Sequence, residues 1–431
     1  MPLSTKPYKG ARDFYPEDKR LQKYMFSTWR AVCESFGYEE YDAPILEPLE
    51  IYLAKTGQEI VSEQTYLFQD RGGREVVIRP EMTPTVSRMV AARRQQLGYP
   101  LRWYSIPNLW RYERPQRGRL REHWQLNVDI FGVEGVEAEL EIISLVDAMF
   151  KAFGARANMY EIRLNSRKLV DAALGDYLRL SQQEAHDVSK LIDKMPKMDK
   201  SKFIAAVDEA LTPKSREAGA TEKLLSLLAV KELKQLPAEL LQHPSVGELA
   251  TTLNTLRKLG IKNTRFDVSL MRGFDYYTDI VFEVFDTHPD NNRSMLGGGR
   301  YDGLVGLFGV QPVPTVGFGW GDVTLANFLE LHRLLPDLPP ATDLYVVLVG
   351  DVAEAARQPI AELRAAGLNV AVDLSGRKLR DQLKTADKKG LTNVLVIGED
   401  ELQSGSFTLR NLETGKEQKL KPADIVKKLR K

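Results

Sequence analysis

Residues 169–259 carry an almost purely helical pattern, and segments with strand-like patterns lie on both sides of them in the 431-residue chain. This stretch is low in aromatic residues and is interrupted by Pro196, Pro213, Pro237 and Pro244. Strands that resume after a run of short helices indicate one domain inserted into another. The sequence therefore predicts a small helical domain within a larger part of the chain that forms strands.

The flanking parts alternate helical and strand-like patterns. Before the insertion we predict helices over 16–36, 83–96 and 137–153, and strands over 41–47, 74–78 and 101–104. After it we predict strands over 264–270 and 279–285, a glycine-rich turn over 297–303, and a strand that leads into a helix over 316–331. Because proline lacks an N–H group, the strand that contains Pro44 is predicted to lie at a sheet edge or an interface.

A proline-rich segment over 334–340 is predicted to be a stiff, extended linker. Beyond it, the predicted elements are strands over 344–349, 369–374 and 393–397, helices over 352–366, 378–389 and 423–429, and a hairpin over 407–420. Strands that alternate with helices predict a separate, compact α/β domain of about 90 residues.

Composition excludes several classes of protein. No apolar run approaches the roughly 20 residues that cross a bilayer, and the first residues lack the apolar stretch of a secretory signal. The single cysteine, Cys33, excludes an internal disulfide and suits a core position better than a nucleophile. The five histidines are scattered, which argues against a histidine-ligated metal site. The balance of 60 basic against 59 acidic residues neither indicates nor excludes a nucleic-acid partner.

Five arginines lie within the segment 110–121, and strand-like patterns flank this segment on both sides. Guanidinium groups bind phosphate oxygens through paired hydrogen bonds, so a cluster on rigid strands suits a polyphosphate or a nucleic acid. A solvated basic hairpin is the alternative interpretation. The spacing alone puts phosphate or nucleic acid slightly ahead.

Two aromatic and glycine-rich segments also suit a ligand site. Tyr276 and Tyr277 adjoin Arg272 between two predicted strands, although buried tyrosines usually serve only the core. The glycines of segment 297–303 allow a ligand to approach the backbone closely, and Tyr301 lies among them. Neither a P-loop nor a dinucleotide-binding fingerprint is present in the sequence.

Glu81 and Thr83 lie at a predicted strand-to-helix junction, where side chains point into a cleft. An acid at the start of a helix is more often a capping residue than a binding residue. Both interpretations stay open for Glu81 on the sequence alone.

Taken in order, these segments resemble histidyl-tRNA synthetase, a class II aminoacyl-tRNA synthetase, from about Lys9 to the C-terminus. The segment from Gly10 to Glu47 resembles the opening and the dimer-forming motif 1 of this family. Arg79-Pro-Glu and the stretches 110–119 and 125–132 resemble its Arg-Pro-Glu and motif 2 segments. Stretches 272–277 and 298–303 resemble the two signatures of the histidyl enzyme, and the tail resembles its anticodon-binding domain.

The resemblance implies an α+β class II catalytic core, an antiparallel sheet flanked by helices, with a helical insertion and a C-terminal α/β anticodon-binding domain. It divides the chain into a first core part at 1–168, the insertion at 169–259, a second core part at 260–332, a linker at 333–342 and the anticodon-binding domain at 343–431. It also implies a homodimer. With no membrane segment, one cysteine and a tRNA partner, we expect a cytoplasmic protein.

The implied activity is that of a histidine–tRNA ligase, which activates L-histidine with ATP and then transfers it to tRNA(His). By family position, Arg111 holds the α-phosphate, Arg119 reaches the outer phosphates and Arg272 neutralises the reacting centre, so Arg111 and Arg272 are the expected catalytic residues. Glu113 and Arg300 complete the expected ATP site. Mg²⁺ is expected to bridge the phosphates, mostly through water and phosphate oxygens, so no side-chain metal cluster is expected.

The histidine substrate needs separate contacts for its ammonium and its imidazole. The resemblance assigns Glu81, Thr83 and Gln125 to the amino group, Asp129 and Tyr277 to the imidazole, and Tyr276, Tyr301 and Arg272 to the same pocket. A site built on hydrogen bonds can reject apolar isosteres by about 10⁴ or more. Arg114 and Gln116, in the motif 2 loop, are expected to touch the acceptor end of the tRNA.

One position departs from the family. Motif 3 of the family carries an arginine that packs on the adenine and contacts the γ-phosphate, and Thr324 stands at that position here. A threonine supplies neither a charge nor a stacking plane. Either another cation such as Arg300 takes part of the role, or ATP binding is weak, or the protein is not a full synthetase.

Two other functions therefore stand beside the ligase. One is a non-catalytic paralogue such as the regulatory subunit of ATP phosphoribosyltransferase, and the other is a sensor that binds histidine or tRNA without ligation. The paralogue generally lacks the anticodon-binding domain and tends to lose the catalytic arginines, whereas this chain keeps Arg111, Arg119 and Arg272. Retained phosphate-binding arginines favour the ligase.

Overall fold

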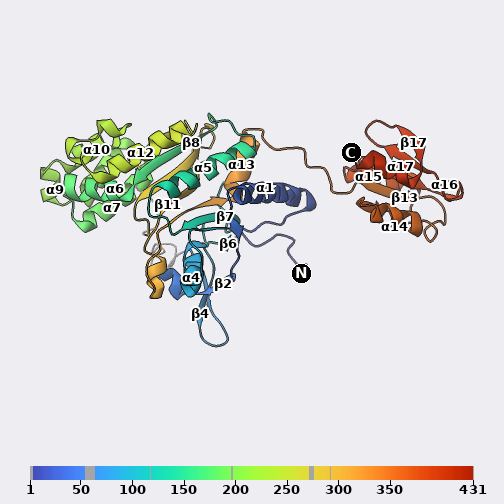
Figure 1. Ribbon diagram of the computed structural model, residues 1–431, viewed down its shortest axis with the longest axis horizontal. Helices are drawn as coiled ribbons and strands as arrows, with labels where there is room; N and C mark the ends of the chain where they lie inside the picture. Colours follow the sequence, from blue (N-terminus) through green and yellow to red (C-terminus); the bar gives the residue numbers. More distant parts are fainter. Residues whose placement is uncertain are drawn as a thin grey trace. The chain divides into compact units, whose positions relative to one another are not determined.

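The computed structural model describes residues 3–53, 64–116, 118–195, 198–270, 276–291 and 293–430 (Figure 1). The chain divides into two compact units. The first comprises Met1–Asp13 and Gln22–Leu335, and the second comprises Phe14–Leu21 and Pro336–Lys431.

A nine-stranded sheet, counted over the described residues, forms the centre of the first unit. In spatial order its strands are β1 (Glu39–Glu40), β5 (Leu101–Ser105), β7 (Glu122–Phe131), β12 (Thr315–Gly321), β11 (Ser294–Arg300), β10 (Ile280–Asp286), β8 (Tyr160–Ser166) and β9 (Thr264–Phe266), while β6 (Asn108–Trp110) pairs with β7. The pairs from β5 to β8 are antiparallel, and only the outer pairs β1–β5 and β8–β9 are parallel. The predicted antiparallel sheet is therefore confirmed, with strands from both sides of the insertion.

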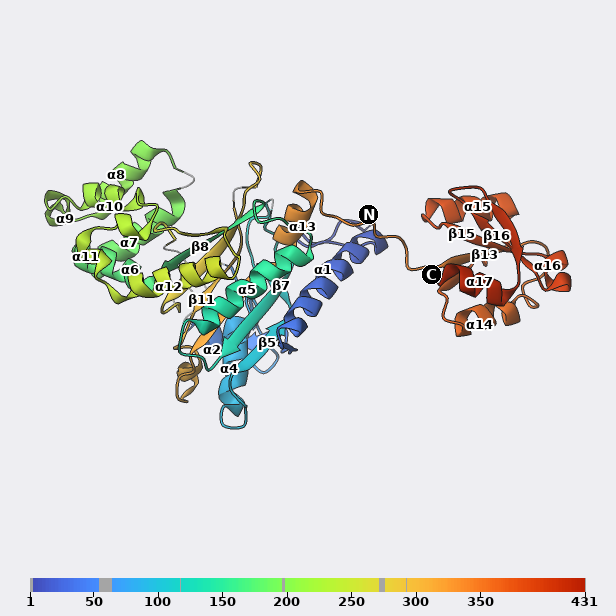
Figure 2. The same cartoon turned by 45° about the horizontal axis from the view of Figure 1, so that its top comes forward.

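Helices α1 (Pro16–Ser35) and α5 (Glu137–Ala152) run side by side along one face of this sheet (Figure 2). Phe150 of α5 stacks on Tyr160 and on Trp320, with ring centroids 4.1 and 4.6 Å apart, and Trp29 of α1 packs against Trp320 at 5.8 Å. These large apolar side chains are fully buried and form the core between the sheet and the helices. Further helical elements of this part are α2 (Glu50–Leu53), α4 (Thr83–Arg93), η4 (Val305–Phe308) and α13 (Asp322–Leu331).

The predicted glycine-rich turn over 297–303 is wrong for its first half, because residues 297–299 lie inside strand β11. A Cβ atom on Gly298 would lie 2.3 Å from the carbonyl oxygen of Gly317 in the next strand. Glycine is required here by the close approach of neighbouring strands rather than by a turn.

A second, three-stranded antiparallel sheet, again within the described residues, is formed by β2 (Leu46–Pro48), β4 (Glu75–Ile78) and β3 (Tyr66–Gln69). The predicted strand over 41–47 is shorter than expected, because strand pairing begins only at Leu46 and Pro44 precedes it. The carbonyl groups next to Pro44 bind Arg79 instead: its Nη1 donates to Ala43 at 2.7 Å and its backbone N–H to Ile45 at 3.0 Å.

The stretch between β8 and β9 is helical, as its sequence pattern predicts (Figure 1). Its elements are α6 (Arg167–Asp171), the π-helical segment η1 (Ala172–Tyr177), α7 (Gln182–Lys194), α8 (Lys200–Ala210), α9 (Pro213–Glu217), α10 (Ala220–Leu228), η3 (Leu233–Gln235), α11 (Ala238–Leu241) and α12 (Pro244–Lys258). Ser181 and Glu184 form a capping box at the start of α7. Pro213 and Pro244, which interrupt the helical pattern in the sequence, are each the first residue of a helix.

The second unit holds a five-stranded sheet in the order β14 (Val370–Val372), β13 (Leu344–Leu348), β15 (Asn393–Ile397), β16 (Phe407–Asn411) and β17 (Glu417–Leu420), counted over the residues described there. The first three strands are parallel and the last two form an antiparallel hairpin. The helices are α14 (Arg357–Ala365), α15 (Leu379–Lys388), α16 (Glu399–Ser404) and α17 (Pro422–Leu429). This is the predicted α/β organisation, with a separate core centred on Val346, Leu363 and Leu395.

None of the helices formed by the described residues is both long and apolar enough to cross a membrane.

Candidate active site

A cavity of about 1520 Å³ opens on the face of the main sheet opposite α5. Its lining brings together ten of the residues that the sequence resemblance assigns to the site: Glu81, Thr83, Arg111, Glu113, Arg119, Gln125, Asp129, Tyr276, Tyr277 and Tyr301. A volume above the usual 300–1,000 Å³ of ligand pockets leaves room for more than one small substrate.

The floor of the cavity consists of side chains of β7 set against glycines of β12. Successive side chains of a strand alternate between its faces, so Gln125, Asn127 and Asp129 share the cavity face. In register opposite Asp129 lies Gly317, where a Cβ atom would stand 2.0 Å from the Asp129 Oδ1 atom. Gly299 continues this row in β11. The glycines therefore leave a flat surface beside Asp129 on which a ligand can lie.

Asp129 and Tyr301 form the buried end of the cavity. The Tyr301 hydroxyl donates a 2.5 Å hydrogen bond to Asp129 Oδ1. Burial raises the pKa of Asp129 to about 7, although the hydrogen bond from Tyr301 acts in the opposite direction. Tyr276 packs its ring against Tyr301, with centroids 5.6 Å apart. The result is an aromatic pocket with one carboxyl group, which suits a planar polar ring.

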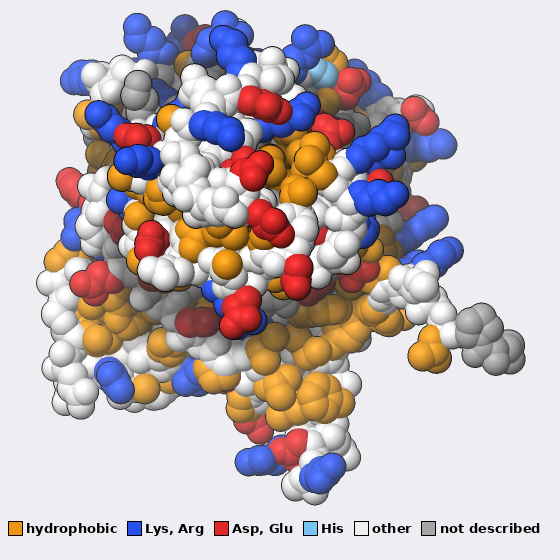
Figure 3. Space-filling view, turned by 90° about the vertical axis from the view of Figure 1, so that its right-hand side faces the viewer, with side chains coloured by type: hydrophobic (Ala, Val, Ile, Leu, Met, Phe, Trp, Pro, Cys, Tyr) orange, Lys and Arg blue, Asp and Glu red, His pale blue; other side chains and the backbone are white. Residues whose placement is uncertain are grey.

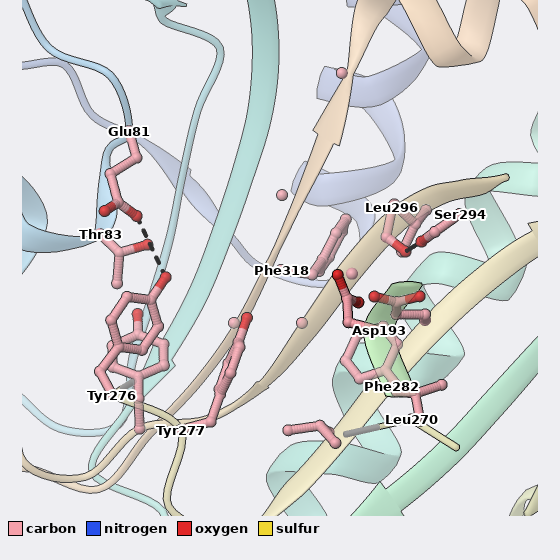
Figure 4. Close-up of a pocket in the computed structure, with 18 of the residues that line it drawn as sticks. Glu81, Thr83, Asp193, Leu270, Tyr276, Tyr277, Phe282, Ser294, Leu296 and Phe318 are labelled. Carbon is pink, nitrogen blue, oxygen red and sulfur yellow. Dashed lines mark hydrogen bonds between the residues drawn. The ribbon is translucent and has the colours of Figure 1, made fainter. Parts of the chain in front are cut away.

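Glu81 and Thr83 lie beside this pocket, with the ring of Tyr276 pointing toward them (Figure 4). Glu81 is 2% exposed, and its Oε2 accepts a hydrogen bond from the Tyr276 hydroxyl at 3.3 Å. Helix α4 starts after Met82 without a side-chain cap. Glu81 is therefore a buried carboxylate at the cavity wall and not the helix cap that its sequence position also allowed.

The cavity is also lined by two arginines of the segment that resembles motif 2, Arg111 and Arg119. Arg111 follows β6, and its Nε donates to the carbonyl oxygen of Pro80 at 2.8 Å. Arg119 lies at the base of a tight hairpin in which it bridges with Gln116. Its Nη1 lies 3.6 Å from Glu113 Oε2, and about half of its side chain is exposed. Two arginines and two buried carboxyl residues, Glu81 and Asp129, thus line a single cavity.

The prediction that Arg300 belongs to the ATP site is wrong, because the structure does not bring this residue to the cavity. In β11 it pairs in register with Val316 and faces the α5 side of the sheet. There its Nε and Nη2 donate to the two carboxylate oxygens of Glu139 at 2.7 Å, Nη2 also donates to the carbonyl oxygen of Gly135, and Nη1 donates to that of Val133. Strand alternation explains the change, since Gly299 faces the cavity and the next residue must face away.

The remaining expected residues lie at the rim or outside the described part of the chain. Arg272 is one of residues 271–275, which the structure does not describe. Arg114 and Gln116 are exposed on the motif 2 hairpin and are not part of the cavity lining, and Gln116 Oε1 accepts a hydrogen bond from Arg293 at 3.3 Å.

Thr324 lines the cavity in the first turn of α13. Its hydroxyl lies 2.8 Å from the carbonyl oxygen of Met295 and 2.9 Å from that of Gly321. Its hydroxyl therefore serves the local backbone.

Two sets of cavity residues were not expected from the sequence. His123 lies on the cavity side of β7, and burial, together with Arg111 and Arg12, lowers its pKa to about 3, so the imidazole is neutral. The insertion adds one side of α7, with Gln182, His186, Ser189, Lys190 and Lys194. Alternation with Gln125 could have indicated His123, and the four-residue spacing of 182, 186, 190 and 194 could have indicated a shared face of α7.

No group of three or more His, Cys, Asp or Glu side chains that could hold a metal ion occurs among the residues that the structure describes.

Comparisons with known proteins agree with this arrangement. A family model described as histidyl-tRNA synthetase matches residues 10–321, and a model described as an anticodon binding domain matches residues 343–431. A histidine–tRNA ligase of Leptospira biflexa is 46% identical over 412 residues, which cover 95% of this chain and 94% of the relative. A histidine–tRNA ligase of Thermoplasma volcanium is 37% identical over 428 residues, or 98% of each chain.

The crystal structure of histidyl-tRNA synthetase from Nostoc sp. PCC 7120 matches with a TM-score of 0.82 and 25% identity, over 100% of this chain and 99% of that one. The predicted class II fold with an anticodon-binding domain is confirmed by this match and by the family models. The chain belongs to the histidyl-tRNA synthetase family.

Proposed function

We propose that the protein is a histidine–tRNA ligase that activates L-histidine with ATP and transfers it to tRNA(His). The observation that carries this proposal is the convergence of buried Glu81 and Asp129 with Arg111 and Arg119 on one cavity. Relatives named histidine–tRNA ligase that align over nearly their whole length support it.

Histidine fits the carboxyl end of the cavity. Glu81 would bind the α-ammonium with Thr83 and Gln125, and Asp129 would bind one imidazole nitrogen. Tyr277 would bind the other nitrogen, while Tyr276 and Tyr301 enclose the ring. Because each polar atom of the substrate has a polar partner, an isostere without these atoms would leave buried groups unpaired and bind poorly.

Activation joins the histidine carboxylate to the α-phosphorus of ATP. One carboxylate oxygen forms the new P–O bond, the bond from the α-phosphorus to the bridging oxygen breaks, and pyrophosphate leaves. Arg111 would neutralise the charge that develops at the α-phosphate, with Arg272, and Arg119 would hold the outer phosphates with Glu113 close by. Mg²⁺ would enter with ATP as part of the substrate, bound mainly by phosphate oxygens and water.

Transfer follows when a ribose hydroxyl at the 3′ end of the tRNA attacks the carbonyl carbon of histidyl-adenylate and AMP leaves. Arg114 and Gln116, exposed on the motif 2 hairpin, would contact the acceptor end. The domain at 343–431 would bind the anticodon region of tRNA(His). We propose that the domains of the chain are 1–168, 169–259, 260–332, 333–342 and 343–431. Because a tRNA ligase acts where tRNA is charged, we also propose that the protein lies in the cytoplasm.

We also propose a homodimer. The small sheet and α2 leave large apolar side chains 44–58% exposed, namely Ile45, Leu46, Leu53, Leu67 and Phe68. In Figure 3 hydrophobic side chains gather on the hairpin of β3 and β4, which projects at the bottom of the view, above its charged tip. An apolar surface of this kind on a folded chain is typical of a protein interface, and a second copy of the chain would cover it.

The regulatory paralogue is not favoured. Thr324 is the feature that pointed to it, but a protein without ATP chemistry has no need of Arg111 and Arg119 in the same cavity as a histidine pocket.

Histidine-dependent exchange between ATP and pyrophosphate tests the activation step. We expect exchange with the native protein and a loss of about 10²–10³ in rate for Arg111→Ala and Arg272→Ala. Arg216→Ala, which removes an exposed arginine of the insertion, is the matched control and should keep the native rate. Absence of exchange in a native protein that still binds histidine would move the function to a sensor.

A further inference from the structure

We propose that Tyr52 is a positioning residue that holds the backbone of Glu81 and thereby sets the affinity for the α-ammonium group of histidine. This inference rests on the proposed function for the identity of the ligand and adds a residue outside the cavity lining to the histidine site.

The loop that carries Glu81 is held through three consecutive carbonyl groups. The carbonyl oxygen of Arg79 accepts from the backbone N–H of Trp110 at 3.2 Å, and that of Pro80 accepts from Arg111 Nε at 2.8 Å. The carbonyl oxygen of Glu81 accepts from the Tyr52 hydroxyl at 3.3 Å. Two of these donors belong to motif 2, whereas Tyr52 comes from the separate short helix α2.

Tyr52 is built into the core. Its side chain is fully buried, and its hydroxyl also lies 3.1 Å from Thr85 Oγ1. If the Thr85 hydroxyl donates to Tyr52, the Tyr52 proton is left to point at Glu81. A buried hydroxyl that both donates and accepts a hydrogen bond holds its two partners in place, because moving either partner would leave a polar group unpaired.

The contact acts on one end of the ligand. The Glu81 carboxylate faces Tyr276 and the proposed ammonium site, and its backbone is the part that Tyr52 holds. Asp129 and Tyr301, which face the imidazole, lie on β7 and directly after β11 and have no contact with Tyr52 among the described hydrogen bonds. Loss of the Tyr52 hydroxyl should therefore weaken recognition of the ammonium and leave recognition of the ring unchanged.

The test is calorimetric titration of the full chain with histidine and with 3-(imidazol-4-yl)propionate, which lacks the α-ammonium. For Tyr52→Phe we expect the Kd for histidine to rise about three- to tenfold, the typical effect of one lost hydrogen bond. The Kd for the propionate should not change. Tyr38→Phe is the matched control, because Tyr38 is also a buried tyrosine whose hydroxyl donates to a carboxylate, Glu141, away from the cavity.

A second variant separates positioning from a general loss of structure. In a Glu81→Gln background, Tyr52→Phe should have little further effect on the Kd for histidine, since the group that Tyr52 positions has already lost its charge. An unchanged Kd for histidine, or an equal rise for both ligands, would overturn the inference. A native protein that binds histidine but catalyses no exchange would refute the ligase while leaving the Tyr52 test intact, and one that does not bind histidine would refute both.

Discussion

Asp129 shows how a single buried carboxyl can tie the proposed histidine site to the stability of the protein. Its pKa rises from 3.8 to about 7 because burial penalises the charged form. The folded state thus binds a proton that the unfolded state has released over this range. By linkage, this contribution makes the protein less stable as the pH rises from about 4 to about 7.

We therefore predict that the free energy of unfolding of the native protein falls, relative to that of Asp129→Asn, as the pH rises through this range. Guanidinium unfolding of both proteins at several pH values measures the difference, which should amount to a few kcal/mol and level off above pH 7. Parallel curves for the two proteins would show that Asp129 titrates normally.

The motif that contains Arg300 indicates the family, but it does not predict which face of the sheet the Arg300 side chain points to. The sequence resemblance placed it with ATP, whereas the register of β11 turns it to Glu139 on the other face of the sheet. Removing one partner of a buried ion pair typically costs about 3–5 kcal/mol. We predict that Arg300→Met lowers the unfolding free energy by this amount, and that adding Glu139→Leu recovers part of the loss.

The steady-state KM for ATP checks this correction. A stable Arg300→Met protein with a raised KM for ATP would contradict the buried pair and restore Arg300 to the ATP site. Since Arg300 is 4% exposed and its nitrogens are engaged with Glu139, Val133 and Gly135, we expect the change in stability and an unchanged KM for ATP.

At the scale of elements, glycines in β11 and β12 decide the shape of the site. A Cβ atom at residue 317 would lie 2.0 Å from Asp129 Oδ1 and 2.7 Å from the carbonyl oxygen of Val128. We predict that Gly317→Ala displaces Asp129 and weakens histidine binding at least about 100-fold, because both the pocket and its carboxyl must shift. Calorimetric titration with histidine measures this loss.

Gly247→Ala is the matched control. Gly247 lies in helix α12, and a Cβ atom there would meet nothing within 4 Å. This substitution should leave histidine binding unchanged and stabilise the protein by about 0.5–1 kcal/mol, because alanine favours a helix interior. Equal histidine affinity for the two variants would mean that the glycine floor does not shape the site.

The elements also show what periodicity can and cannot predict. The predicted helices over 16–36 and 137–153 agree closely with α1 and α5, because each buries one regular apolar face. The prediction of a turn at residues 297–299 is wrong, since a strand whose cavity-side residues are glycines shows no alternation of side chains in its sequence. The pairing around Pro44 and the direction of Arg300 depend on contacts with distant segments, which no local pattern contains.

At the scale of the whole molecule, the exposed apolar surface of β2, α2 and β3 predicts association of two copies. Leu67 and Phe68 are 49% and 44% exposed on the same strand. We predict that Leu67→Asp shifts the mass in analytical ultracentrifugation from dimer toward monomer, because a charge at a buried apolar interface is costly.

Leu374→Asp serves as the control for this substitution. Leu374 is 85% exposed and lies in the second unit of the chain, outside the small sheet. It should leave the mass unchanged. A native protein that sediments as a monomer, or an unchanged mass for Leu67→Asp, would refute this surface as the dimer interface.

Ligation itself is measured by the charging of tRNA(His) with radiolabelled histidine. In the presence of ATP and Mg²⁺, we predict label that is precipitated with the tRNA, is released by mild alkali, and is absent when periodate has oxidised the 3′-terminal ribose. Formation of histidyl-adenylate without label on the tRNA, or no incorporation at all by a folded protein that binds histidine, would contradict it.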